Sequence, residues 1–241
     1  MTGGLLFDFD GTLVDTFDDI VEGVQRARRR LGAGPLDPQE VRRHIGWGAR
    51  HLMGLCHPTL DPQRPSQMPE DGALLPIPSE EIDEALRLFR QEYSRILLRQ
   101  THPYAGMPEM CRALARDGLS LAVISNKPER FVRQLLAGLA LADPFQLIIG
   151  GDTLGCAKPD PEPLRRAAQR LGLPLRRCIM IGDGRLDLLA AHAAGIACCA
   201  VAWGLSSEEE LIALGPAHLA RTPKDLEAWL RGTLRSMTLQ S

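Results

Sequence analysis

The sequence predicts an α/β fold, in which a Rossmann-like parallel sheet forms a core and an all-helical cap domain is inserted into it. Three observations lead to this prediction. Short apolar runs alternate with amphipathic stretches along most of the chain, a segment of purely helical periodicity interrupts the alternation, and polar residues directly follow several apolar runs. Alternating strands and helices are typical of an open parallel sheet with helices on both faces and right-handed crossovers.

Five segments have the pattern of strands. Each is short, apolar throughout and followed by polar or glycine residues, as expected for parallel strands that are covered on both faces. These segments are Gly4–Phe9, Leu119–Ser125, Gln146–Ile149, Cys178–Gly182 and Ile196–Val201. Helices are expected between the last four of them, at about Pro128–Leu139, Pro161–Leu171 and Leu186–Ala194, and a last surface helix is expected at Pro223–Leu234, before a ragged polar end.

Residues 16–100 are expected to form the inserted helical cap, so that the core comprises residues 1–15 and 101–241. Apolar residues between Phe17 and Leu31 follow helical spacing, and Gly32 is a stop signal. The stretch 57–78 holds six of the 18 prolines and little periodicity, which predicts an irregular loop.

Two further cap helices are predicted from their start signals. Asp37–Glu40 has the form of an N-cap, an N1 proline and a capping box for a helix over Val41–Ile45. Ser79 can cap a long helix that carries a line of apolar residues from Ile82 to Leu97.

Composition excludes several classes of protein. With 28 basic and 30 acidic residues the net charge is −2, and there is no basic stripe, so we expect no nucleic-acid partner. The six cysteines form no C-x-x-C pair, which indicates reduced thiols and a cytoplasmic setting. The N-terminus has no basic region, and the apolar stretch Leu188–Leu205 is better explained by a buried helix and strand than by a membrane span.

Polar clusters follow four of the five predicted strands. Asp8 and Asp10 come after the first strand, with Gly11 and Thr12 next in the chain; Ser125 and Asn126 end the second, Lys158 follows the third, and Asp183 and Asp187 follow the fourth. Each cluster has a simpler explanation when taken alone, as turn acids, a helix N-cap, a surface lysine and acids favoured by a helix dipole.

Taken together, these clusters predict one site. The carboxyl ends of parallel strands meet at one edge of a sheet, where ligands bind. Asp8, Asp10 and Asp183 supply hard oxygen ligands that suit Mg²⁺. Lys158 can balance charge, and Ser125 can donate to a phosphoryl oxygen. This set of residues suits phosphoryl transfer to a carboxylate nucleophile.

The same residues resemble the haloacid-dehalogenase-like (HAD) hydrolase superfamily. Its pattern of D-x-D-G-T-L/V, a strand-end Ser/Thr, a lysine and G-D-x-x-x-D is met in order by Asp8–Asp15, Ser125-Asn126, Lys158-Pro159 and Gly182–Asp187. The helical insert after the first motif is similar to the cap of phosphoglycolate-phosphatase-like members.

The resemblance implies a role for each residue. Asp8 would be the nucleophile that forms an aspartyl-phosphate, and Asp10 the general acid and then the general base. Mg²⁺ would be held by Asp8, the Asp10 backbone carbonyl and Asp183, with Asp187 in support. The phosphoryl group would be bound by Ser125, Asn126 and Lys158.

The resemblance also ranks the possible activities. Asp10 argues against a haloacid dehalogenase, and the absence of lysine from residues 16–100 argues against a phosphonate-cleaving enzyme. A phosphatase of a small phosphorylated metabolite, first of all 2-phosphoglycolate, is the leading hypothesis. The alternatives are a phosphatase of another sugar or acid phosphate, a hexose phosphomutase and a non-catalytic binding protein.

Arg50 is the cap residue for which we predict a substrate contact. It lies in Gly46–His51, which resembles the loop that reaches over the site in such members, and it could hold a substrate carboxylate bidentately. An ordinary surface arginine is the alternative, because 25 of the 28 basic residues are arginines.

Overall fold

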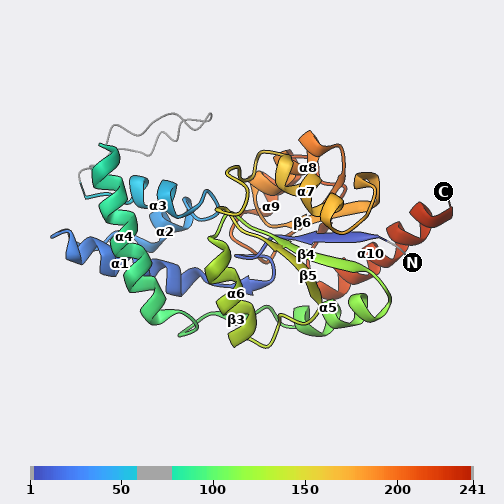
Figure 1. The fold of residues 1–241 in the computed structure, drawn as a ribbon, viewed down its shortest axis with the longest axis horizontal. Coiled ribbons are helices and arrows are strands. Elements are labelled where there is room, and N and C mark those ends of the chain that lie inside the picture. The colour runs from blue at the N-terminus through green and yellow to red at the C-terminus, as the bar shows by residue number, and fades with distance from the viewer. Residues whose placement is uncertain (1–2, 59–77, 240–241) are drawn as a thin grey trace. The chain divides into compact units, whose positions relative to one another are not determined.

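The computed structural model describes residues 3–58 and 78–239, which divide into two compact units (Figure 1). The core unit comprises Met1–Asp15 and His102–Ser241, and the inserted unit comprises Thr16–Thr101. The irregular loop predicted at 57–78 falls almost entirely on residues 59–77, which lie outside the described part. In the described part, no helix is both long and apolar enough to cross a membrane.

The core unit is built on a six-stranded parallel sheet with the order β5-β4-β1-β6-β7-β8. Its strands are β1 (Gly4–Phe7), β4 (Ser120–Ile124), β5 (Phe145–Ile149), β6 (Cys178–Gly182), β7 (Ala197–Val201) and β8 (His218–Ala220). The first five match the predicted segments, so the predicted fold class is confirmed. Strand β8 was not predicted because it has only three residues and shows no apolar run.

Alternation along the strands explains why both faces of the sheet are apolar. Leu6 pairs with Ala122 and with Met180, and all three belong to one buried cluster with residues of α7 and α8. Leu5 and Phe7 point to the opposite face because side chains alternate along a strand, and both are fully buried. Figure 1 shows α7 and α8 above the sheet and α5 and α10 below it.

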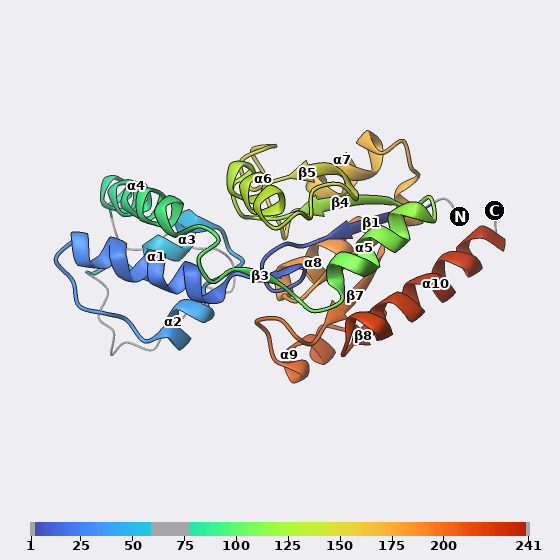
Figure 2. The ribbon, with the colours of Figure 1, turned by 90° about the horizontal axis from the view of Figure 1, so that it is seen from below.

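The helices of the core unit are α5 (Met107–Arg116), α6 (Glu129–Gly138), α7 (Glu162–Arg170), α8 (Arg185–Ala194), α9 (Glu208–Ala213) and α10 (Pro223–Leu239), with a 3₁₀ turn at Leu175–Arg177. Both ends of α6, α7 and α8 lie within one residue of the prediction. The ragged end expected after Leu234 is wrong, because α10 continues to Leu239 without a glycine or proline to stop it. Helix α10 is also not a plain surface helix: it lies beside α5 (Figure 2) and buries Leu226, Leu230 and Leu234.

The strand order reverses at β1, with β4 on one side of it and β6 on the other. In open α/β sheets, ligands bind outside the carboxyl ends of the strands at this point. After β1 the chain forms β2 (Val14–Asp15), which pairs antiparallel with β3 (His102–Pro103). The topology therefore places the loops after β1, β4 and β6 next to one another.

The described part of the inserted unit contains four helices, α1 (Phe17–Arg30), α2 (Pro38–Arg42), α3 (Ala49–Leu55) and α4 (Ser79–Ile96). Helices α1 and α4 pack closely, since a Cβ at Gly23 would lie only 3.0 Å from the ring of Phe89. The two ends of the unit are joined by the buried Asp19, whose Oδ2 accepts hydrogen bonds from the backbone N and the hydroxyl of Thr101 at 2.9 and 2.7 Å.

Three predicted details of the inserted unit are wrong. Asp37 caps α2 by accepting from the Gln39 N–H at 2.8 Å, so the helix begins at Pro38, ends at Arg42 and does not extend to Ile45. Pro78 occupies the N-cap position of α4, and Ser79 is the first helical residue. The segment Gly46–His51 is a loop only as far as Gly48, because α3 begins at Ala49.

Candidate active site

Asp8 follows β1 directly and lies at the carboxyl edge of the sheet. Its backbone N–H donates to the Ile181 carbonyl at 2.8 Å, which continues the pairing of β1 with β6 by one residue. The side chain is largely buried, and its Oδ1 accepts from the Phe9 N–H at 2.7 Å. The sheet thus fixes the position of this carboxylate through the backbone.

Gly11 allows the loop after β1 to pass close to β6. It has φ of +83°, a left-handed conformation that favours glycine, and its N–H donates to the Val14 carbonyl at 2.9 Å. A Cβ at this position would lie 2.2 Å from Asp183 Oδ2, so a larger residue would displace that carboxylate. The close approach of this loop to Asp183 therefore depends on Gly11.

Asp183 directly follows β6 and is held on both oxygens. Thr12 donates its hydroxyl to Oδ1 at 2.8 Å, and the Leu205 N–H donates to Oδ2 at 2.8 Å. The Trp203 indole N–H in turn donates to the Thr12 carbonyl at 3.1 Å. The loop after β7, which was not predicted to contribute to the site, therefore orients one of its carboxylates.

Lys158 bridges two of the predicted acids. Its Nζ lies 2.8 Å from Asp8 Oδ1 and 2.6 Å from Asp187 Oδ1, and its side chain is 2% exposed. Asp187 lies in the first turn of α8 and accepts from the Gly184 N–H at 3.1 Å. The bridge brings together residues that are far apart in the sequence, as predicted from the strand-end clusters.

The electrostatics of this cluster favour a further positive charge. Burial and the nearby Asp187 carboxylate raise the pKa of Asp8, and the same two causes raise the pKa of Asp183. Burial alone would lower the pKa of Lys158, but the Asp187 and Asp8 carboxylates outweigh it and raise that pKa. With all three carboxylates ionised, one ammonium would leave an excess of buried negative charge, which a bound cation would balance.

The donor set of the cluster fits a hard divalent cation. One carboxylate oxygen from each of Asp8, Asp183 and Asp187 lies within 4.8 Å of the others, and all three residues are buried. Oxygen donors of this kind suit Mg²⁺ or Ca²⁺. Asp187, predicted only as a supporting residue, belongs to this group, whereas the Asp10 side chain does not.

The Asp10 carboxylate turns instead to Lys127. Lys127 Nζ donates to Asp10 Oδ1 at 2.9 Å, and both side chains are largely buried. Lys127 lies outside the motifs from which the site was predicted. A signal was available, because Lys127 is one of only three lysines and directly follows the strand-end pair Ser125-Asn126.

Ser125 and Asn126 follow β4 and are buried. The Asn126 amide donates to the Lys158 carbonyl at 2.8 Å and accepts from the Lys158 N–H at 2.9 Å. Ser125 Oγ accepts from the Lys127 N–H at 3.3 Å. These contacts tie the loop after β4 to both lysines, while the predicted binding of phosphate by Ser125 and Asn126 stays a prediction.

Residues 5–201 match the family model for haloacid dehalogenase-like hydrolases. The match covers most of the chain and includes the predicted site residues that follow the strands, from Asp8 to Asp187. The chain belongs to the haloacid dehalogenase-like hydrolase family. The resemblance drawn from the sequence motifs is thereby confirmed.

Relatives of known name agree with this membership. Phosphoglycolate phosphatase 1 of Pseudomonas aeruginosa is 36% identical over 224 residues, which are 92% of this chain and 77% of that protein. Phosphoglycolate phosphatase of Chromobacterium violaceum is 36% identical over 205 residues, 85% of this chain and 87% of that protein. A crystal structure from Lactobacillus delbrueckii subsp. bulgaricus has a TM-score of 0.82 and covers 93% of this chain and 96% of its own, at 24% identity.

These similarities carry two conclusions. The likeness to the Lactobacillus structure concerns the fold, whereas the family match and the more similar relatives make this haloacid dehalogenase-like chain a hydrolase of the phosphatase kind. The predicted enzyme class is therefore confirmed. A phosphatase acts on small phosphorylated substrates.

Arg50 has partners within the inserted unit of this hydrolase. It pairs with Asp83 of α4, and its Nη2 donates to the Ser79 hydroxyl at 2.7 Å. Its side chain is 49% exposed. The predicted contact with substrate stays a prediction, and a substrate carboxylate would have to compete with Asp83.

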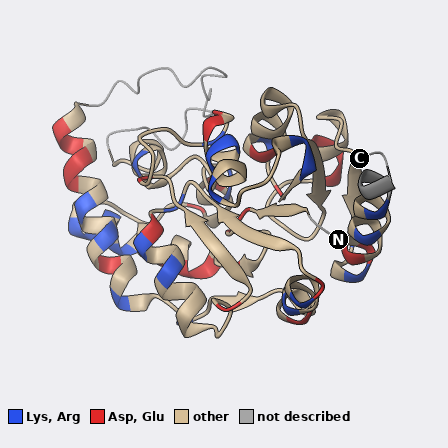
Figure 3. Ribbon diagram, turned by 45° about the vertical axis from the view of Figure 1, so that its right-hand side comes forward, with Lys and Arg blue, Asp and Glu red and all other residues tan. Residues whose placement is uncertain are grey.

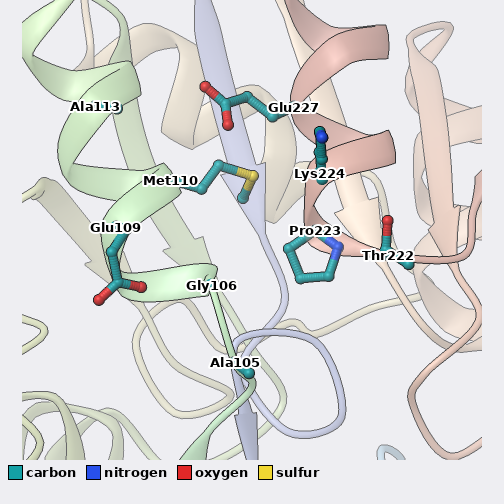
Figure 4. A pocket seen from close by; sticks show the side chains of 9 residues that line it. All are labelled: Ala105, Gly106, Glu109, Met110, Ala113, Thr222, Pro223, Lys224 and Glu227. Atoms are coloured by element: carbon teal, nitrogen blue, oxygen red, sulfur yellow. The ribbon is translucent and has the colours of Figure 1, made fainter.

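A cavity of about 380 Å³ in the core unit of the hydrolase lies away from these residues (Figure 4). Its walls are the first turns of α5 and α10, with Met110 on the α5 side and Pro223 and Glu227 on the α10 side. None of the candidate site residues lines it. The cavity is therefore no part of the carboxylate cluster.

Proposed function

We propose that this phosphatase hydrolyses 2-phosphoglycolate, a small phosphomonoester, in a Mg²⁺-dependent reaction through an aspartyl-phosphate. The observation that carries the chemistry is the buried Lys158 ammonium held between Asp8 and Asp187, beside Asp183. The substrate is supported by the relatives named phosphoglycolate phosphatase.

Asp8 is the nucleophile in this proposal. One of its carboxylate oxygens forms a bond to phosphorus while the bond between phosphorus and the substrate's ester oxygen breaks. Water then attacks phosphorus, the acyl phosphate bond breaks, and inorganic phosphate leaves with the Asp8 carboxylate restored. Lys158, at 2.8 Å from Asp8 Oδ1, reduces the repulsion between the carboxylate and the phosphate dianion.

Asp10 moves the protons of both steps. Protonated, it donates to the leaving alkoxide in the first step, and as a carboxylate it takes a proton from the attacking water in the second. Its side chain lies outside the Asp8–Asp183–Asp187 group, which suits a residue that exchanges protons.

Asp8, Asp183 and Asp187 would hold Mg²⁺, together with the predicted backbone carbonyl of Asp10. When bound there, the ion supplies positive charge that stabilises the phosphoryl oxygens. Ser125 would donate its hydroxyl to one of these oxygens. Asn126 would contribute by holding the Lys158 backbone, as its two hydrogen bonds at 2.8 and 2.9 Å support.

The inserted unit serves in this proposal as the cap that selects the leaving group, and the enzyme works in the cytoplasm. The six cysteines are free, which suits a reducing compartment. The physiological partner is then a small phosphorylated metabolite and no macromolecule.

A panel of phosphomonoesters tests the proposal. Phosphoglycolate, hexose phosphates and p-nitrophenyl phosphate are assayed with Mg²⁺ and with EDTA, and an Asp8→Asn preparation controls for contaminating phosphatases. We expect the highest kcat/KM for phosphoglycolate and no turnover in EDTA. Full activity without metal would contradict the mechanism, and interconversion of hexose phosphates in place of hydrolysis would favour the mutase alternative.

A further inference from the structure

Lys127 is a buried lysine whose partner is the proposed acid–base residue. Its side chain is 6% exposed, and its Nζ donates to Asp10 Oδ1 at 2.9 Å across 117 positions of sequence. An ammonium with so little access to water persists only when a carboxylate or comparable partner stabilises it. The pair is therefore built into the fold.

The backbone around Lys127 is held on both sides. Its N–H donates to Ser125 Oγ at 3.3 Å, and its carbonyl accepts from the Gly151 N–H at 3.0 Å. The chains approach so closely here that a Cβ at Gly151 would lie 2.3 Å from the Asn126 carbonyl oxygen. The lysine therefore extends from a fixed base, and its ammonium has a defined place.

The two buried lysines of the site divide the carboxylates between them. Lys158 contacts Asp8 and Asp187, at 2.8 and 2.6 Å. Lys127 contacts Asp10. Without Lys127, the nearest buried ammonium left to attract the Asp10 carboxylate would be that of Lys158, and a turn in that direction would bring Asp10 towards the other acids.

We propose that Lys127 is a positioning residue for Asp10. It holds the Asp10 carboxylate in one orientation, apart from the Asp8–Asp183–Asp187 group, so that Asp10 faces the leaving oxygen and the attacking water. This inference rests on the proposed function, because it assigns to Asp10 the proton transfers of that mechanism. Lys127 itself forms no bond to phosphorus and transfers no proton.

The first test separates the two chemical steps. With phosphoglycolate, Lys127→Met should lower kcat about 10- to 100-fold, a part of the 10²–10⁴-fold that acid–base assistance contributes. With p-nitrophenyl phosphate, whose leaving group needs no proton, the rate of the first-turnover burst should fall less than about threefold, while the later steady state falls as with phosphoglycolate. If Lys127→Met lowered the burst rate with p-nitrophenyl phosphate as much as it lowers kcat with phosphoglycolate, Lys127 would bind the phosphoryl group. That result would overturn the proposal.

A double-mutant cycle tests whether Lys127 acts through Asp10. In the Asp10→Asn background, adding Lys127→Met should lower kcat by less than about a further threefold, because the group that Lys127 positions is already disabled. If the two substitutions lowered kcat independently, so that their fold-losses multiplied in the double variant, the proposal would be overturned. The double variant also removes both charges together, so its comparison with Asp10→Asn stays measurable if Lys127→Met alone folds poorly.

Lys224→Met is the matched control. Lys224 is the third lysine of the chain and is exposed at the start of α10, so its replacement should leave kcat unchanged for both substrates.

Crystal structures of the wild type and of Lys127→Met decide the geometry without any assay. The Asp10 carboxylate should move by more than about 1 Å in the variant, a displacement large enough to cost 10²-fold in rate. An unmoved Asp10 would overturn the positioning role. If the wild type hydrolysed no phosphomonoester, or if Asp10→Asn had no effect, the proposed function would fail instead, and the structures would still decide the role of Lys127.

Discussion

Charged pairs at the edge of the core sheet differ from those of the inserted unit in one respect, their contact with water. Lys158 and Asp187 are 2% and 3% exposed in their side chains, whereas Arg87 and Glu84 of α4 are 51% and 48% exposed at the same distance of 2.6 Å. Figure 3 shows acidic and basic residues side by side along the outer helices, while the strands are mostly uncharged.

The difference explains why the core edge indicates function and the inserted unit does not. An exposed pair contributes about 0–1 kcal/mol and needs no special reason to exist. A buried charge costs several kcal/mol in lost hydration, and a sequence retains it when partners and function require it. The predictions below test this contrast.

Asp8→Asn should have the largest effect. An amide cannot attack phosphorus, so turnover of every phosphomonoester should be abolished while the fold is kept, since the change removes one of several repelling carboxylates. Asp18→Asn, the same change at an exposed position of the inserted unit, should leave steady-state rates unchanged. Residual hydrolysis by a pure Asp8→Asn preparation would remove Asp8 from the mechanism.

Lys158→Met should be the most destabilising of these changes. It leaves two buried carboxylates without their ammonium, which should lower the free energy of unfolding by about 3–5 kcal/mol. Arg87→Met, which removes an exposed pair, should lower it far less. Urea unfolding in metal-free buffer measures both, and equal losses would break the contrast between the two regions.

Arg50→Ala should have an intermediate effect that depends on the substrate. If Arg50 binds the substrate carboxylate, kcat/KM for phosphoglycolate should fall roughly 10- to 150-fold. This loss corresponds to about 1.5–3 kcal/mol for one charge-assisted hydrogen bond. Activity on p-nitrophenyl phosphate, which has no carboxylate, should be nearly unchanged. Arg87→Ala is the matched control. Equal losses on both substrates would assign Arg50 to the fold of the inserted unit through Asp83, and no loss would make it an ordinary surface residue.

The smallest effect is a pH dependence of stability in EDTA. The raised pKa values of Asp8 and Asp183 mean that the folded protein holds protons that the unfolded chain releases above about pH 4. Stability should therefore fall as pH rises, by up to about 1.4 kcal/mol per pH unit for each such group.

The slope has to be measured below the raised pKa values, about 8 for Asp8 and about 7 for Asp183, because above them both the folded and the unfolded state have released the proton. Burial lowers the pKa of His44, His51 and His57, and an unfolded histidine is mostly neutral above about 6.5, so these residues contribute only at lower pH. Urea titrations between about pH 5 and pH 7 measure the slope in the wild type and in Asp183→Asn, where the histidines act equally. Stability should fall less steeply with pH in the variant. Equal slopes in the two proteins would contradict the raised pKa of Asp183.

The fold could be predicted well because its signals are local. Each buried parallel strand is an apolar run, and the starts of α6, α7 and α8 follow from proline and strand-end residues next to them in the sequence. Strand β8 and the last turns of α10 could not be predicted, because three residues make no pattern and a helix end without a stop signal is set by packing.

The candidate site was predictable where residues follow strands and not where tertiary contacts recruit them. Asp8, Asp183, Asp187 and Lys158 could be placed together because the strands of a parallel sheet end at one edge. The contact of Lys127 with Asp10 and that of the Leu205 N–H with Asp183 depend on how side chains and loops turn after those strands. No spacing in the sequence encodes such contacts.

The central claim is that Asp8 accepts the phosphoryl group, and trapping the intermediate tests it most directly. The Asp10→Asn variant with p-nitrophenyl phosphate should release nitrophenolate in a burst close to one per enzyme, because the leaving group needs no acid but the next step lacks its base. Mass spectrometry of the acid-quenched protein should then locate the phosphoryl group on Asp8. A burst that leaves phosphate on another residue, or wild-type turnover with no covalent adduct under any quench, would contradict the account.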